Sequence, residues 1–300
     1  MSQLGLIVSN EFKTDISSKS FWISTFIVPV ILGLFGAFAG VMLSDSSFMS
    51  ATEALPTTPE ADEMTPLKAL GMMLGIFPVL FLMIYGSMIF NKVKTEKCNR
   101  IVEILATCVD GRTMMLGKII SVGLIGLLQL TLWFVIGACV VGFSLLVVGV
   151  RFPWEVFGNF DYWMALIWAI VYFIGGYIFY GSLFAAVGAM TDKNNENQSY
   201  VAVLTFVLLA SFYIGEYAVD NSSGAFITAC SFIPFTSSTV LTVISAAKEA
   251  PVWLSLSGLA VLYVFALITL MISGKIYTSS LLLKGKKFAP KDIITFLKSR

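Results

Sequence analysis

The sequence is dominated by apolar runs that are long enough to cross a lipid bilayer. A helix needs about 20 apolar residues to span the hydrocarbon core, and six segments reach that length. They are residues 20–43, 67–91, 114–150, 162–190, 199–219 and 251–275. Only 12% of the residues are charged, whereas an ordinary soluble domain has about 25%. We therefore predict an all-α polytopic membrane protein whose six transmembrane helices form a single domain over 1–300.

Two of these runs allow a second interpretation. Residues 114–150 exceed what one crossing needs, so two spans joined by a tight turn could fit. No polar turn interrupts this run, and we predict one long, bent helix instead. Residues 21–43 could be the core of a signal peptide, but they are longer than such a core. We therefore expect the first span to be retained.

The segments between the spans differ in character. In residues 1–19, apolar side chains recur at three- and four-residue steps, which predicts an amphipathic helix lying along the membrane surface. Residues 44–66 are polar and rich in proline, as expected of an extracellular loop. Residues 220–250 carry Pro234 and are too broken for a full crossing, which favours two short re-entrant helices on the extracellular side.

The distribution of basic residues predicts the orientation. With the amino terminus in the cytoplasm, only Lys68, Arg151 and Lys248 of the 19 basic residues lie outside. Cytoplasmic segments of membrane proteins are enriched in lysine and arginine. We therefore place both termini, including the tail 276–300, in the cytoplasm of a prokaryote, with the chain in its plasma membrane.

Several classes of function are excluded by what the sequence lacks. The chain has no histidine, which rules out imidazole metal sites and Ser-His-Asp catalysis. A net charge of +1 argues against nucleic acid as a partner. The stretch from Gly111 to Ile119 is only a near miss for a phosphate loop, because it has one residue too many between the glycines and no Ser or Thr after Lys118. We expect no enzymatic activity, cofactor or metal in this chain.

One cytoplasmic segment stands out among the connections. Residues 92–113 are rich in charge and contain a short helical pattern, in which Ile101, Ile104 and Leu105 lie on one side and Arg100 and Glu103 on others. A small amphipathic helix between two spans could transmit a conformational change from a partner protein to the membrane helices. An ordinary solvated loop is the alternative.

The sequence around this segment resembles that of ABC type-2 exporter permeases, especially the NatB-like branch. The resemblance rests on residues 96–105 (EKCNRIVEIL), on Gly117-Lys118 and on Gln129. Residues 10–13 (NEFK), residues 232–237 (FIPFTS) and the tail motif Gly285-Lys286-Lys287 are similar to further landmarks of the family. The chain differs from many NatB-like permeases in having only a loop at 44–66 in place of a large extracellular domain.

The resemblance implies a partner and a set of coupling residues. In this family two permeases, in a homodimer or a related heterodimer, assemble with two cytoplasmic ATPase subunits, which bind the ATP and magnesium. The segment between spans two and three docks on the ATPase. By resemblance, the ATPase-coupling residues of this chain are Glu96, Arg100, Glu103, Leu105, Arg112 and Lys118.

Two polar residues within the predicted spans are candidates for the substrate pathway. Gln129 lies near the centre of the third span and needs a hydrogen-bond partner there, either in a neighbouring helix or in a substrate. Glu216 lies near the outer end of the fifth span, where it could contact substrate or be solvated among the head groups.

Together these features predict the transmembrane permease of an ATP-driven exporter, moving a small ion, drug, peptide or lipid-like substrate out of the cell. An ATP-independent secondary transporter or channel is the alternative. Such transporters often carry inverted repeats and charges buried at mid-membrane, and the sequence shows neither pattern clearly.

Overall fold

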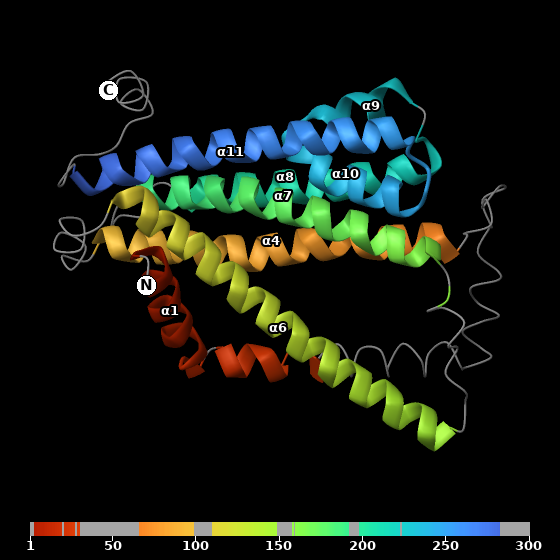
Figure 1. Ribbon diagram of the computed structural model, residues 1–300, viewed down its shortest axis with the longest axis horizontal. Helices are drawn as coiled ribbons and strands as arrows, with labels where there is room; N and C mark the ends of the chain where they lie inside the picture. The colour runs from red at the N-terminus through yellow and green to blue at the C-terminus, as the bar shows by residue number, and fades with distance from the viewer. Residues whose placement is uncertain are drawn as a thin grey trace.

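The structure is a computed structural model that describes residues 3–19, 21–27, 29–30, 66–98, 110–148, 158, 160–191, 198–222 and 224–282. Within these ranges the ordered elements are helices, without any strand (Figure 1). They are α1 (Gln3–Ile16), α4 (Pro66–Cys98), α6 (Gly111–Val148), α7 (Phe160–Met190), α8 (Gln198–Asp220), α9 (Ala225–Phe232), α10 (Pro234–Ala246) and α11 (Val252–Leu282). The predicted all-helical class is therefore confirmed for the part of the chain that is described.

Five of these helices are long and apolar enough to cross a membrane, namely α4, α6, α7, α8 and α11. The bent pair α9 and α10 gives a sixth candidate if it is counted as one span. The predicted first span, 20–43, and the loop 44–66 lie mostly outside the described residues. The described helices thus support a multi-pass membrane protein with five to six candidate spans.

Helices α4 and α6 both extend into residues 92–113, the segment predicted from the sequence to lie between two membrane spans. Helix α4 continues through Lys92 to Cys98, and α6 begins at Gly111. Residues 99–109, including Arg100, Glu103 and Leu105, lie outside the described residues. The flanks of the predicted coupling segment are therefore direct continuations of two long helices.

Helix α6 runs uninterrupted for 38 residues. At ~1.5 Å per residue this is well beyond the ~30 Å of a hydrocarbon core. Figure 1 shows that its first half packs against the other helices while its carboxyl-terminal half diverges from them. Consistent with this divergence, a Cβ built on Gly137 would have no atom of another described segment within 4 Å.

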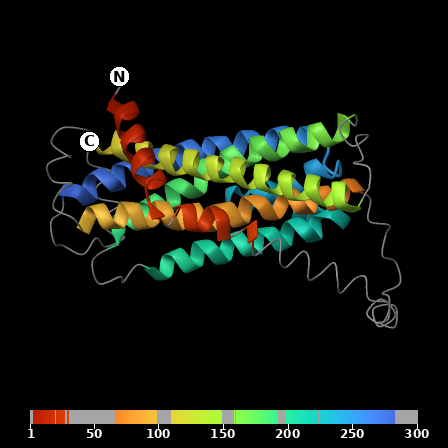
Figure 2. The same ribbon diagram turned by 90° about the horizontal axis from the view of Figure 1, so that it is seen from below.

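Helix α7 lies at the centre of the bundle, packed against α4, α10 and α11. Its aromatic side chains Tyr172, Phe179, Tyr180 and Phe184 are fully buried. Gly188 lets α4 approach closely, because a Cβ at this position would lie 2.7 Å from the backbone oxygen of Phe90. Helix α4 in turn lies between α6 and α8 (Figure 2).

Helices α9 and α10 form a hairpin in which the chain bends by 119° at Ile233. Pro234 starts α10, a position where its missing N–H costs no helical hydrogen bond. Lys68 Nζ lies 3.4 Å from Asp220, at the end of α8, and 3.9 Å from Glu249, after α10. Since one lysine reaches both, the chain leaves α8 and returns from the hairpin at the same end of the bundle.

Candidate coupling site

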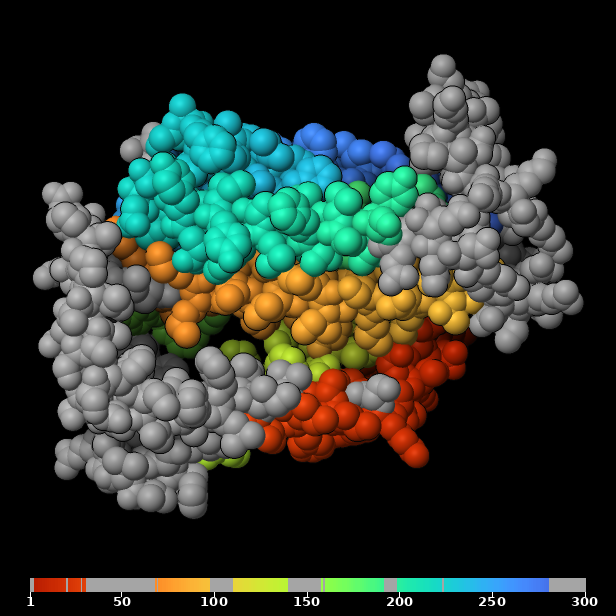
Figure 3. Space-filling model, turned by 180° about the vertical axis from the view of Figure 1, so that it is seen from behind, coloured from red at the N-terminus to blue at the C-terminus, as the bar shows by residue number. Residues whose placement is uncertain are grey.

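The amino-terminal helix α1 lies across the end of the bundle where α4 ends and α6 begins (Figures 1 and 2). It packs on α6, and a Cβ built on Gly117 would lie 2.6 Å from Ile7 Cγ2. Glycine at this position lets the two helices approach closely. Seen from the face in Figure 3, α8, α4 and α1 follow one another across the molecule.

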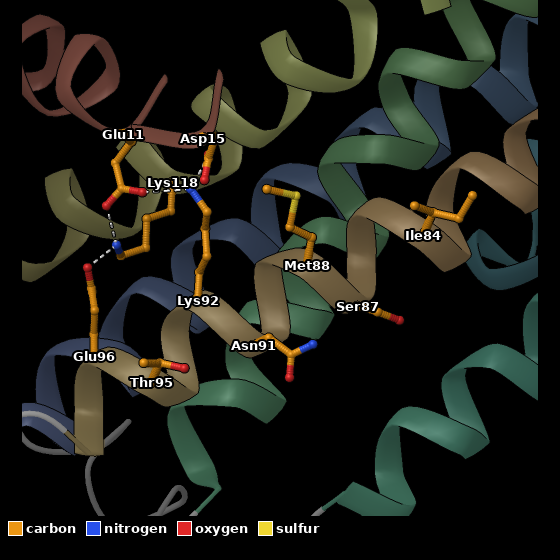
Figure 4. Close-up of a pocket in the computed structure, with 10 residues that line it drawn as sticks. All are labelled: Glu11, Asp15, Ile84, Ser87, Met88, Asn91, Lys92, Thr95, Glu96 and Lys118. Atoms are coloured by element: carbon orange, nitrogen blue, oxygen red, sulfur yellow. Dashed lines mark hydrogen bonds and ion pairs between the residues drawn. The ribbon is translucent and has the colours of Figure 1, made fainter. Parts of the chain in front are cut away.

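Two acidic residues on one face of α1, spaced one turn apart, meet two lysines from other helices (Figure 4). Glu11 Oε2 lies 2.7 Å from Lys92 Nζ of α4, and Glu11 Oε1 lies 2.9 Å from Lys118 Nζ of α6. Lys92 also pairs with Asp15. One carboxylate thus joins three helices, and the second adds an ion pair between α1 and α4.

The same lysine connects α6 to α4. Lys118 pairs with Glu96, in the last turns of α4, and the other oxygen of Glu96 accepts a hydrogen bond of 2.9 Å from the Tyr277 hydroxyl of α11. We call the six residues Glu11, Asp15, Lys92, Glu96, Lys118 and Tyr277 the charge network. It ties α1, α4, α6 and α11 together at the flanks of residues 99–109.

Burial makes the charge network energetically sensitive. The side chain of Lys118 is only 2% exposed, and a buried charge is tolerated only with partners. Burial alone would raise the pKa of Glu11, but the charges and hydrogen bonds of Lys118 and Lys92 outweigh it and lower that pKa. For Asp15 burial prevails, helped by the negative charge of Glu11, and the pKa is raised despite Lys92.

A hollow of about 600 Å³ opens between α1 and α4, beside the charge network. The residues that line it from α4 follow one side of the helix for about three turns, as Figure 4 shows. Its lining residues are Glu11, Asp15, Ile84, Ser87, Met88, Asn91, Lys92, Thr95, Glu96 and Lys118. The wall changes from apolar at Ile84 and Met88 to charged at the network.

Of the six predicted coupling residues, three can be placed. Glu96 and Lys118 face one another inside the molecule. Arg112 is exposed at the start of α6, and its stem lies beside α11, where a Cβ on Gly274 would be 3.2 Å from Arg112 Cγ. Arg100, Glu103 and Leu105 lie outside the described residues.

The two candidates for the substrate pathway lie in different surroundings. Gln129 is buried, accepts a hydrogen bond of 2.8 Å from the Tyr85 hydroxyl and donates one of 3.2 Å to Ser24 Oγ. It joins α6 to α4 and to the helical stretch at 21–27. Glu216 is half-buried, and its Oε1 has no hydrogen-bond partner among the described residues.

Four members of the charge network were not singled out from the sequence as site residues: Glu11, Asp15, Lys92 and Tyr277. The available signal was the pair of acids one turn apart on an amphipathic helix that is otherwise expected to lie on a membrane surface. Among the described residues, no group of three or more His, Cys, Asp or Glu side chains could hold a metal ion.

The fold and this site together define a class, that of all-helical, multi-pass membrane proteins. A family model described as "ABC-2 family transporter protein" matches residues 49–275. The chain therefore belongs to the ABC-2 transporter family, whose members are membrane components of ABC transporters.

Two curated relatives resemble the chain over most of its length. The uncharacterized protein YhaP of Bacillus subtilis (strain 168) is 26% identical over 240 residues, which is 75% of this chain and 56% of the relative. The uncharacterized protein MJ1024 of Methanocaldococcus jannaschii is 22% identical over 212 residues, covering 71% and 49% respectively. The chain thus spans about half the length of the curated relatives it matches. No solved structure matches it significantly.

Proposed function

We propose that this chain is the permease subunit of an ABC exporter in a prokaryotic plasma membrane, driven by a separate cytoplasmic ATPase. Membership of the ABC-2 family supports the class of transporter. The resemblance of residues 96–105 to NatB-like permeases supports export as the direction. ATP and magnesium belong to the partner, and a second permease copy completes the assembly.

The observation that carries the proposal is the position of the charge network. It links the last turns of α4 to the first turns of α6, and residues 99–109 connect these two helices. Because Glu96 and Lys118 are paired across this connection and α1 braces both helices, the base of the two helices is held as one body. A force applied by an ATPase to residues 99–109 would therefore move α4 and α6 together.

We propose two roles for the predicted coupling residues. Glu96 and Lys118 act as positioning residues, since each is engaged inside the permease. Arg112 is exposed and available to a partner. Arg100, Glu103 and Leu105 provide the docking contacts, in which charges fix the register and the apolar side adds contact area.

The proposed topology puts this end of the bundle in the cytoplasm and the α9–α10 hairpin in the outer leaflet as a re-entrant pair. The hairpin is short and largely apolar, and the ion pairs of Lys68 place both of its ends together. The substrate is a small ion, drug, peptide or lipid-like molecule that leaves the cell.

Co-purification tests the proposal directly. The tagged permease is expressed with an ABC ATPase encoded beside it, and we expect the two to purify together. Arg100→Glu and Glu103→Arg should weaken the association or uncouple ATP hydrolysis from transport, because they reverse charges at the docking segment. Lys248→Glu, a charge reversal at the opposite end of the bundle, is the matched control and should leave the association intact.

Two results would overturn the proposal. The first is that both variants of the docking segment associate with the ATPase and couple ATP hydrolysis to transport as the unaltered chain does. The second is sustained transport by this chain alone in liposomes without ATP, which would indicate the alternative of a secondary transporter or channel.

A further inference from the structure

We infer that the hollow between α1 and α4 is a binding site for an amphiphile with a single cationic head group, such as an alkylammonium. This inference concerns a ligand of the permease itself and does not depend on the ATPase. It rests on the size of the hollow, on the gradient of its wall and on the balance of charge within it.

The size and the wall fit a molecule with an apolar body and a polar head. A volume of about 600 Å³ lies within the range of small-molecule sites. Ile84, at one end, is 54% exposed and belongs to a membrane-crossing stretch of α4. Glu96, at the other end, is ~18 Å further along the helix, at 1.5 Å per residue. Ser87, Asn91 and Thr95 form the polar transition between them.

The charges lining the hollow favour a cation. Glu11, Asp15 and Glu96 contribute three negative charges when ionised, whereas Lys92 and Lys118 contribute two positive charges. The ion pairs form a chain in the order Asp15, Lys92, Glu11, Lys118 and Glu96. Each lysine is already shared by two carboxylates, so neither is free for an anion. A single positive charge would balance the set.

At one end of this chain of ion pairs, the Asp15 carboxylate can accept a further cationic partner. Among the described residues it forms an ion pair only with Lys92, whereas the second oxygen of Glu96 already accepts the Tyr277 hydroxyl. The Asp15 side chain is 14% exposed and faces the hollow (Figure 4). A cationic head group beside Asp15 therefore gains a largely desolvated carboxylate, while its chain covers Met88 and Ile84.

Equilibrium binding of labelled dodecyltrimethylammonium to the full chain in phosphatidylcholine nanodiscs tests the inference. We expect saturable binding of one molecule per chain above the uptake of empty nanodiscs. Dodecyl sulfate, with the same chain and an anionic head, should not compete. Tetramethylammonium, which lacks the chain, should not compete either.

Two variants locate the site on the permease. Asp15→Asn should weaken binding by about tenfold, the effect of losing one charge-assisted contact. Ser87→Trp should abolish binding by filling the hollow without touching the charge network. The matched controls are Asp220→Asn, at the opposite end, and Met73→Trp, on an exposed stretch of α4. Both should bind as the unaltered chain does.

Three results would each overturn the inference. If nanodiscs containing the chain take up no more dodecyltrimethylammonium than empty nanodiscs, the chain has no such binding site. Equal competition by dodecyl sulfate removes the preference for a cation. Unaltered binding in Ser87→Trp shows that the ligand does not bind in the hollow. This result can be interpreted even if Asp15→Asn does not fold.

Discussion

Lys118 connects three helices at the end of the bundle where α4 ends and α6 begins. It is 2% exposed and lies between carboxylates from two other helices, Glu11 of α1 and Glu96 of α4. A lysine is rarely buried to this degree unless it is paired. The sequence marks it only as a basic residue at the end of a span, which is an ordinary feature of membrane proteins.

Replacing this lysine should destabilise the chain through the charges it leaves behind. Lys118→Met keeps the length of the side chain but deprives Glu11 and Glu96 of a partner, and we expect a loss of about 3 kcal/mol in thermal unfolding. Adding Glu96→Gln to Lys118→Met should recover part of the loss, because one uncompensated charge is removed. Lys275→Met, at an exposed lysine, is the control and should melt like the unaltered chain. A double variant less stable than Lys118→Met alone would contradict this account.

The two acids of α1 should respond to pH in opposite senses. The pKa of Glu11 is lowered by Lys118 and Lys92, so its contribution to stability is present above the pKa of the unfolded chain and is lost as pH falls through the folded value. The pKa of Asp15 is raised by burial, so its ionisation opposes folding near neutral pH. That penalty is relieved as pH falls through the folded value.

Thermal melting of Glu11→Gln and Asp15→Asn between about pH 7 and pH 4 separates the two effects. Relative to the unaltered chain, Glu11→Gln should be destabilised at neutral pH, and its deficit should shrink toward the acidic end. The melting temperature of Asp15→Asn, measured as the difference from the unaltered chain, should instead fall as pH is lowered. Difference curves with the same slope would refute the assignment.

Packing between helices depends on a few close approaches, of which that of α4 to α7 is the clearest. A Cβ at Gly188 would lie 2.7 Å from the Phe90 backbone oxygen and 3.1 Å from Val93 Cβ. The carbonyl cannot move aside as a flexible side chain could. The two helices must therefore separate to admit even a methyl group.

Gly188→Ala should lower the stability of the bundle by about 1–3 kcal/mol, the usual cost of overpacking. Gly137→Ala is the matched control, since a Cβ at that position of α6 would have no atom of another described segment within 4 Å. The control should be neutral or slightly stabilising, because alanine favours helix over glycine by about 1 kcal/mol. Equal melting temperatures for the two variants would show that the approach of α4 to α7 is not tight. The melting temperatures are measured by circular dichroism on the purified variants in detergent.

At the scale of the helices, the apolar runs can be recognised in the sequence more readily than the residues at which the helices end. The apolar runs 162–190 and 199–219 fall within α7 and α8, and polar links border both runs in the sequence. Hydropathy ended the second span near residue 91, yet α4 continues to Cys98. Charges end a hydrophobic run without ending a helix, and here Lys92 and Glu96 are held by partners from α1 and α6.

The site was predictable only in part for a related reason. Glu96 and Lys118 could be selected by resemblance, but their pairing depends on how α4 meets α6. Glu11 lies 81 and 107 positions from its two lysine partners, and no local period encodes such a contact. On sequence alone, the acids of α1 looked like the solvated face of a surface helix.

The two ends of the whole molecule differ in charge, which bears on its orientation. At one end, Lys92 and Lys118 pair with acids, while Arg112 and Lys275 are exposed. At the other end, the described basic residues are Lys68 and Lys248, each paired with acids. Since lysine and arginine accumulate in cytoplasmic segments, the first end is expected to face the cytoplasm.

Cysteine labelling of intact cells tests this orientation together with the course of the α9–α10 hairpin. In a chain lacking Cys98, Cys108, Cys139 and Cys230, single cysteines are introduced as Asp110→Cys, Asn221→Cys and Glu249→Cys. A membrane-impermeant maleimide should label positions 221 and 249 and should reach position 110 only after permeabilisation. If the hairpin instead crossed the bilayer once, positions 221 and 249 would be labelled from opposite sides. That result would also contradict the contacts of Lys68 with both Asp220 and Glu249, because one side chain cannot reach across a membrane.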